Sequence, residues 1–156
     1  MNVHEAIENA EAILPGEATP EGQEDPRWQA IIAVADFTED EPEPLWAFVE
    51  RWGQHPDEDL RQAIATCLLE HLLEHHFDLV FPRVERLARS NPCFAQAVGM
   101  CWLFGDAERP NNAARLGELV KNVKCEMQKL CDTARNTLRK NCEDGKPHDP
   151  TGRGSG

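Results

Sequence analysis

The 156-residue sequence contains no tyrosine, and its lysines all lie at or after Lys121. No apolar run approaches the ~20 residues that a membrane-spanning helix needs, so no association with a membrane is expected. The N-terminus lacks the basic start and the apolar stretch of a secretory signal peptide. Six cysteines are present, but none forms a Cys-x-x-Cys motif. We therefore expect reduced thiols and a cytoplasmic location rather than a disulfide-linked secreted domain.

Basic residues are scarce in the N-terminal half. Residues 1–60 carry 16 acidic and 2 basic side chains, whereas residues 111–156 carry 6 acidic and 9 basic ones, within a total charge of −12. A strongly acidic surface repels the phosphate backbone, so nucleic acid is an unlikely partner. Opposite charges steer association, which favours another protein with a basic surface. The alternative is that the acidity serves only to keep the protein in solution.

Sustained alternation of apolar and polar residues, the pattern of a half-buried strand, is missing. Apolar residues instead recur at spacings of three and four, which predicts an all-α fold. The segment 143–156 has no apolar residue to bury and is expected to be disordered. Helices are predicted near residues 3–14, 26–37, 43–53, 57–75, 78–89, 92–104 and 112–141.

Two sets of helices repeat along the chain. A shift of 34 residues places Asp25-Pro26-Arg27 on Asp59-Leu60-Arg61. A shift of 35 residues places Val49-Glu50-Arg51-Trp52 on Val84-Glu85-Arg86-Leu87. The shared period predicts a helical hairpin of about 34 residues that occurs two to three times, each copy burying its apolar face against the next.

The segment His55–Ile64 resembles the start of the second helix of a HEAT-type repeat, with Pro, Asp, an aliphatic residue, Arg and then small apolar residues. Glu24–Ala30 is a looser copy, and Asn91–Ala95 has lost the Asp and the Arg. The resemblance implies a right-handed solenoid of stacked hairpins. The predicted organisation is an N-terminal capping helix and acidic loop at 1–24, repeats at 25–110, a long amphipathic helix at 111–142 and the tail at 143–156.

The predicted C-terminal helix has apolar residues at alternating steps of four and three, which is the spacing of a coiled-coil seam. Two roles are open for it. It either caps the repeats by packing along them, or it pairs with a second copy, giving a homodimer through 112–142. The seam consists of Leu116, Val120, Val123, Met127, Leu130, Ala134 and Thr137 or Leu138.

The segment from His71 to His75 has the His-x-x-Glu-His order of an inverted zinc-peptidase motif. A helical wheel started at Leu60 places both histidines within the apolar stripe, and the repeat register puts His71 where the preceding copy has Phe37. We therefore expect His71 to be a hydrogen-bonded interior residue, with no metal and no cofactor bound. A zinc site at His71 and His75, with Glu74 as the base, is the weaker alternative.

Surface residues of two kinds are candidates for binding a partner. Trp28 aligns with the polar Gln62, whereas Trp46, Trp52 and Trp102 align with apolar residues and are expected in the core. Acidic residues are concentrated between two predicted helices and at the start of the next, where some also cap a helix. The predicted partner-binding residues are Trp28, Asp36, Glu39, Asp40, Glu41, Glu43, Asp57 and Glu58.

The sequence therefore predicts a non-enzymatic protein–protein interaction module, an acidic adaptor or an inhibitor of the immunity-protein type. One alternative is a DNA base glycosylase of the HEAT-like kind, for which Arg83, Arg86 and Arg89 form a modest basic ridge. The other alternative is the zinc-dependent hydrolase that uses His71 and its neighbours.

Overall fold

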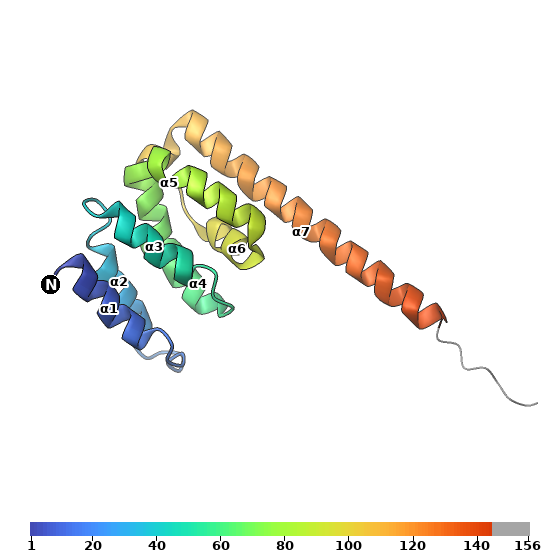
Figure 1. Cartoon of the computed structure of the whole chain (residues 1–156), viewed down its shortest axis with the longest axis horizontal. Coiled ribbons are helices and arrows are strands. Elements are labelled where there is room, and N and C mark those ends of the chain that lie inside the picture. The colour runs from blue at the N-terminus through green and yellow to red at the C-terminus, as the bar shows by residue number, and fades with distance from the viewer. Residues whose placement is uncertain (145–156) are drawn as a thin grey trace, which may run out of the picture. The chain divides into compact units, whose positions relative to one another are not determined.

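The computed structural model describes the backbone of residues 1–144 and the side chains of residues 1–142. Within that range no strand occurs, so the all-α prediction is confirmed (Figure 1). No helix among these residues is long and apolar enough to cross a membrane. The predicted tail 143–156 begins inside the last helix, and its part after Asp144 lies outside the described residues.

Most helices begin and end close to the predicted positions, but the predicted helices 57–75 and 78–89 are not separated and run on through a kink at His76. Their bounds are α1 Val3–Ile13, α2 Pro26–Ala35, α3 Pro42–Trp52, α4 Glu58–Ile64, a π-helical turn η1 Ala65–Leu69, α5 Glu70–Ser90, α6 Pro92–Met100, a short 3₁₀ helix η2 Gly105–Glu108, and α7 Pro110–Asp144.

Side chains that accept hydrogen bonds from free backbone N–H groups fix several of these starts. Asn2 and Glu5 form a reciprocal capping box at α1. Asp25 accepts from the N–H of Arg27 at the start of α2, and Asp57 accepts from the N–H of Asp59 at the start of α4. Asp57 is therefore one of the acidic residues that cap a helix, as the sequence predicted for some of them.

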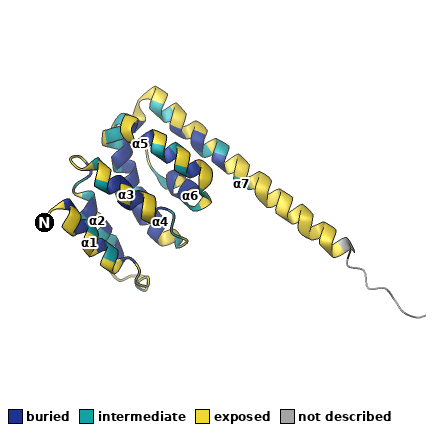
Figure 2. Cartoon of the chain, in the orientation of Figure 1, coloured by how far each residue is buried: buried dark blue, intermediate teal, exposed yellow. Residues whose placement is uncertain are grey.

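The contacts divide the chain into two units, Met1–Val123 and Lys124–Gly156. In the first unit, α2 packs against α1 and α4, α3 packs against α1 and α5, and α6 packs against α4 and α5. The core runs through all these helices (Figure 2). In the second unit, the side chains of residues 124–142 are exposed apart from a half-buried Met127. The predicted domain boundaries at 24 and 110 stay predictions.

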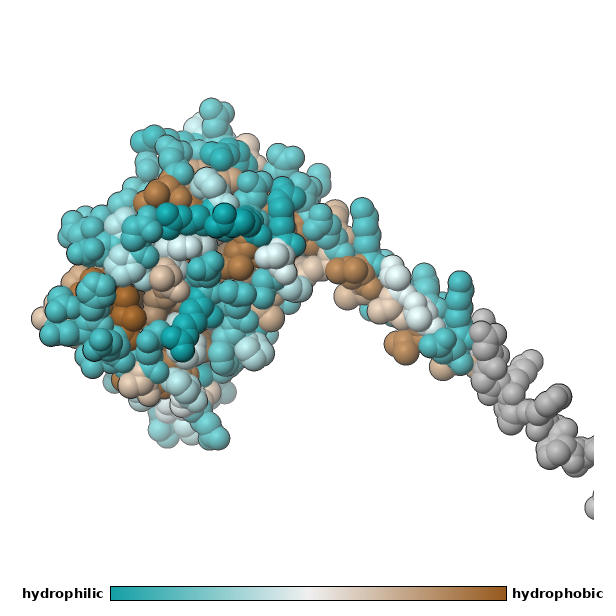
Figure 3. All heavy atoms as spheres, in the orientation of Figure 1, coloured by the Kyte–Doolittle hydropathy of each residue, from teal (hydrophilic) through white to brown (hydrophobic). Residues whose placement is uncertain are grey.

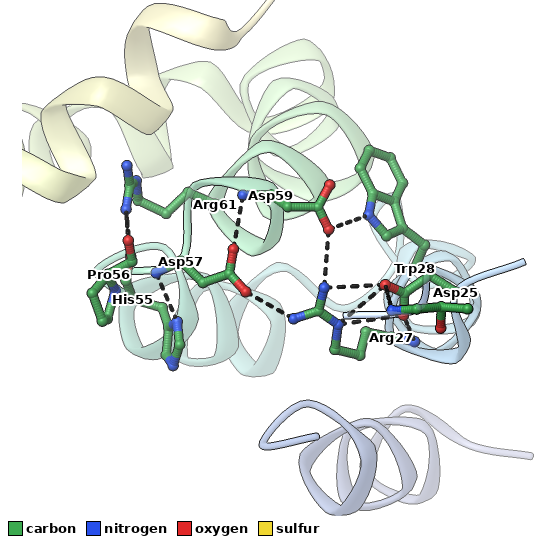
Figure 4. A network of polar contacts seen from close by, with 9 residues as sticks. Asp25, Arg27, Trp28, His55, Pro56, Asp57, Asp59 and Arg61 are labelled. Atoms are coloured by element: carbon green, nitrogen blue, oxygen red, sulfur yellow. Dashed lines mark hydrogen bonds and ion pairs between the residues drawn. The ribbon is translucent and has the colours of Figure 1, made fainter. Parts of the chain in front are cut away.

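Two arginines 34 residues apart are buried between successive helices. Arg27 of α2 is 3% exposed and donates to Asp57 Oδ2 at 2.9 Å and to Asp59 Oδ2 at 3.0 Å, both at the start of α4 (Figure 4). Arg61 of α4 is 5% exposed and donates to Gln96 Oε1 of α6 at 2.7 Å. Arg27 therefore joins α2 to α4, and Arg61 joins α4 to α6.

The π-helical turn changes which residues face the core. A π turn holds one more residue than an α turn, so every residue after it is displaced around the helix axis. Leu72 and Leu73 are buried after the turn, whereas His71 is half exposed. The prediction that His71 lies in the interior is wrong, because the helical wheel assumed an unbroken α-helix from Leu60.

The helix predicted for 92–104 ends at Met100. Cys101 has extended backbone angles, and its thiol donates to the carbonyls of Ala65 and Ala97, both at 3.6 Å. Trp102 is 72% exposed. Its predicted core position is therefore wrong, because the repeat register no longer applies once the chain leaves the helix. Trp46 and Trp52 are buried, as predicted.

Replacing Arg27 with Ala should lower the free energy of unfolding by about 3 kcal/mol, because the change removes the cation of a buried ion pair. The hydrogen bond from Arg27 lowers the pKa of the Asp57 carboxyl below its ordinary value of 3.8. That stabilisation is present above the ordinary pKa and is lost as the pH falls through the lowered value, so the difference between the two proteins should shrink in acid.

Urea denaturation of wild type and Arg27→Ala at pH 7 and in acid measures both effects. Arg51→Ala is the matched control, because Arg51 pairs with Glu11 on the surface and exposed pairs contribute only ~0–1 kcal/mol. Equal losses for the two variants would contradict the role assigned to Arg27.

Candidate functional site

An open hollow of about 510 Å³ lies between α2, the turn that follows it, and the segment η1–α5. It brings together two of the predicted partner-binding acids, Asp36 and Glu39, with the three residues of the predicted zinc motif. Its lining consists of Ile32, Ala35, Asp36, Thr38, Glu39, Thr66, Cys67, His71, Glu74 and His75.

The hollow combines apolar and acidic groups. Ile32 is 43% exposed although it is a large apolar residue, and it lines the hollow together with the small side chain of Ala35. Asp36 and Glu39 are exposed, whereas Glu74 is half buried. A side chain with an aliphatic stem and a cationic head, as in Lys and Arg, complements this combination.

His71 and His75 are both held against carboxylates. His71 Nδ1 lies 2.8 Å from Glu74 Oε2, and the ring stacks on Phe104 with 6.2 Å between centroids. His75 Nε2 lies 3.7 Å from Glu74 Oε2 and 3.7 Å from Glu39 Oε1. In the part of the chain that the structure describes, no group of three or more His, Cys, Asp and Glu side chains is placed to hold a metal ion.

His76 joins the turn between α2 and α3 to α5. The residue has non-helical backbone angles, φ −135° and ψ 40°, and makes a kink inside α5. Its Nε2 lies 3.0 Å from the carbonyl oxygen of Thr38 and 2.9 Å from that of Glu39. Both partners only accept hydrogen bonds, so Nε2 is the protonated donor. The position of Glu39 beside the hollow therefore depends on the kink.

Glu70, next to His71 in the sequence, is a buried acid that the sequence did not reveal. Its side chain is 8% exposed, and its Oε2 accepts a hydrogen bond of 3.0 Å from the N–H of Trp102. Burial raises the pKa of the Glu70 carboxyl above its ordinary value of 4.5. The helical wheel placed Glu70 on the polar side, and only the π turn moves it inward.

The other predicted acidic residues fall into separate places. Asp40 and Glu41 are exposed in the turn between α2 and α3, and Glu58 is exposed at the start of α4. Glu43 forms two hydrogen bonds with Arg83, of 2.8 and 2.9 Å, and these lower the pKa of the Glu43 carboxyl. Its charge is therefore largely neutralised.

Trp28 and Asp57 belong to the network around Arg27 rather than to the hollow (Figure 4). Trp28 is half buried, and its Nε1 donates to Asp59 Oδ2 at 3.1 Å. Their predicted contact with a partner stays a prediction, but both residues have a structural role in this network.

The basic ridge considered for DNA binding is also partly neutralised. Arg83 pairs with Glu43, and Arg89 pairs with Glu85 at 3.0 Å. On the face of the molecule drawn in Figure 3, hydrophilic side chains cover most of the first unit, and hydrophobic ones show through in small areas. The ion pairs among the described residues include Arg83 and Arg89 but not Arg86.

The chain belongs to a family of unknown function (DUF6869), whose match covers residues 17–123. The match includes the whole hollow and ends at the same residue as the first unit. No curated protein and no solved structure matches the chain significantly.

Replacing Glu70 with Gln keeps an oxygen that accepts from Trp102 N–H but removes the buried charge. Because the pKa of Glu70 is raised, the folded state binds more protons than the unfolded state just above pH 4.5, and stability falls as the pH rises through this window. At pH 8 the variant should be more stable than wild type by about 1 kcal/mol.

The gain should vanish below the ordinary pKa of 4.5, where both states are protonated. Thermal or urea denaturation across this pH range measures it, with the exposed Glu8→Gln as control. A gain that does not change with pH would show that the cost of burying the Glu70 charge is not its source.

Proposed function

We propose that the chain is a non-enzymatic protein-binding module that takes a basic segment of a partner protein into the hollow beside α2. The observation that supports the proposal most directly is the exposed Ile32 facing the same space as the carboxylates of Asp36, Glu39 and Glu74. An apolar surface rimmed by charge is a frequent feature of recognition sites.

The proposed architecture is a HEAT-like solenoid of two to three stacked hairpins. Successive packing of α2 on α4 and of α4 on α6, together with packing of α1 on α3 and of α3 on α5, supports it. The two buried arginines at a spacing of 34 residues are further support, because each joins equivalent helices. In such a solenoid, one layer of helices forms an extended surface for binding. The hollow lies on the layer that contains α2.

The chemistry of the hollow favours Arg or Lys as the residue inserted. The aliphatic stem would lie on Ile32 and Ala35, and the cationic head would reach Glu39 and Glu74. Charge-assisted hydrogen bonds to carboxylates are roughly twice as strong as neutral ones. His71 Nδ1 donates to the Glu74 carboxylate at 2.8 Å, which holds that carboxylate in place.

The wider charge distribution supports the same class of partner. The 16 acidic and 2 basic residues of the segment 1–60 create a field that attracts basic proteins and accelerates their association. An inhibitor of the immunity-protein type, which neutralises a basic toxin or nuclease, is one concrete form of such a module.

Selection of binders from a displayed peptide library should enrich sequences that contain Arg or Lys. The isosteric pair Asp36→Asn with Glu39→Gln should weaken binding of a selected peptide by about tenfold or more, since hydrogen bonds to charged groups contribute about 1.5–3 kcal/mol each. Titration calorimetry at low and at physiological salt measures the affinity and its dependence on salt.

The control pair Glu8→Gln with Glu17→Gln removes the same charge from exposed positions outside the hollow. It should reduce binding only slightly, and only at low salt. The proposal is wrong if no basic sequence is enriched, or if both pairs of substitutions weaken binding equally.

A further inference from the structure

One side of α7 between Lys124 and Cys142 carries a largely exposed apolar stripe. At 100° per residue, Met127, Leu130, Cys131, Ala134 and Leu138 fall within an arc of about 100°. Leu130 is 68% exposed and Leu138 is 64% exposed. The polar side is stabilised within the helix, since Gln128 donates to Asp132 and Thr133 donates to the carbonyl of Lys129.

Packing against another surface would stabilise this part of α7. In proteins most of the stability of a helix comes from the packing of its apolar face rather than from intrinsic propensity. Here the sequence includes Thr133, Asn136 and Thr137, which are poor helix formers. The exposed apolar stripe is the surface that such packing would use.

We propose that the stripe pairs with the same stripe of a second copy, with the two helices antiparallel. The pairing is independent of the proposed function of the hollow. It places Leu130 of one copy opposite Ala134 of the other, and Met127 opposite Thr137. Every large residue of the seam then meets a small one, which is how facing layers fill space. A parallel pair would place Ala on Ala and Thr on Thr and leave gaps.

The charged residues beside the stripe favour the same orientation. In the antiparallel register Glu126 of one copy lies beside Lys140 of the other, and the twofold symmetry makes this contact twice. The remaining flanking pairs are Lys124 with Leu138, Cys131 with Cys131 and Thr133 with Thr133, so no like charges meet. Such flanking charges set the orientation of paired helices. In a parallel pair, Glu126 and Lys140 would be about 21 Å apart along the axis.

A second copy explains this complementarity better than an unrelated partner does. An isologous interface requires each patch to match itself after a twofold rotation. The stripe matches itself in both side-chain size and charge. Binding to a different protein would not require the stripe to match itself in either respect. The seam is short, and interfaces below ~1,200 Å² are typical of weak associations. The dimer should therefore depend on protein concentration.

The first experiment is sedimentation equilibrium of the full chain over a range of concentrations. Lys140→Glu should weaken dimerisation by about tenfold, because it turns two favourable pairs into repulsive ones. The charge-swapped double variant Glu126→Lys with Lys140→Glu should restore it. Arg139→Glu is the matched control, since Arg139 lies on the polar side of the helix and should have little effect. A monomer at every concentration, or a double variant that is no better than the single one, overturns the proposal.

The second experiment uses the exposed cysteines of α7 to read the orientation. Variants keep either Cys131 or Cys142 and replace the other two exposed cysteines with Ser, and a variant without all three gives the background from the remaining thiols. A short bis-maleimide should join two chains through Cys131, which lies near the twofold axis. It should not join them through Cys142, because the two Cys142 residues would be about 30 Å apart along the axis. Capture through Cys142, or through neither cysteine, contradicts the antiparallel pair.

Discussion

Burial of the two arginines is the constraint on which the arrangement of the first unit depends. A buried guanidinium is costly unless all its donors find acceptors. Arg27 finds them on Asp25, Asp57 and Asp59. Arg61 finds them on two backbone carbonyls and on Gln96, but its Nε has no hydrogen-bond partner among the described residues. In both cases some acceptors belong to a later helix, α4 for Arg27 and α6 for Arg61, so these helices must meet in one relative position.

Ion pairing with arginine explains part of the acidity of the N-terminal half. Three carboxylates of this half surround Arg27, and Glu43 is paired with Arg83. These acids stabilise the fold and have little charge left for a partner. Asp36 and Glu39 are different, since they line the hollow and are exposed. The distinction between the two groups depends on residues about 30 to 40 positions away, which sequence reasoning cannot pair.

Most helices could be predicted because their signals are local. Apolar residues at three- and four-residue spacing, capping side chains and prolines at helix starts are all visible in the sequence. The π turn Ala65–Leu69 has no comparable signal, because packing from several helices decides where an extra residue fits. It accounts for the wrong placement of His71 and for the failure to find Glu70. Trp102 was misplaced for a related reason, since a repeat register says nothing about where its last helix ends.

The two hydrogen bonds of His76 have a consequence for how the hollow keeps its shape. Nε2 of His76 donates to the carbonyls of Thr38 and Glu39, and so joins the turn between α2 and α3 to the kink in α5. That turn and α5 are two of the walls of the hollow, but His76 itself does not line it. The distance between these two walls is therefore set by a side chain outside the hollow, and a substitution at His76 would alter the shape of the hollow without changing any group on its surface.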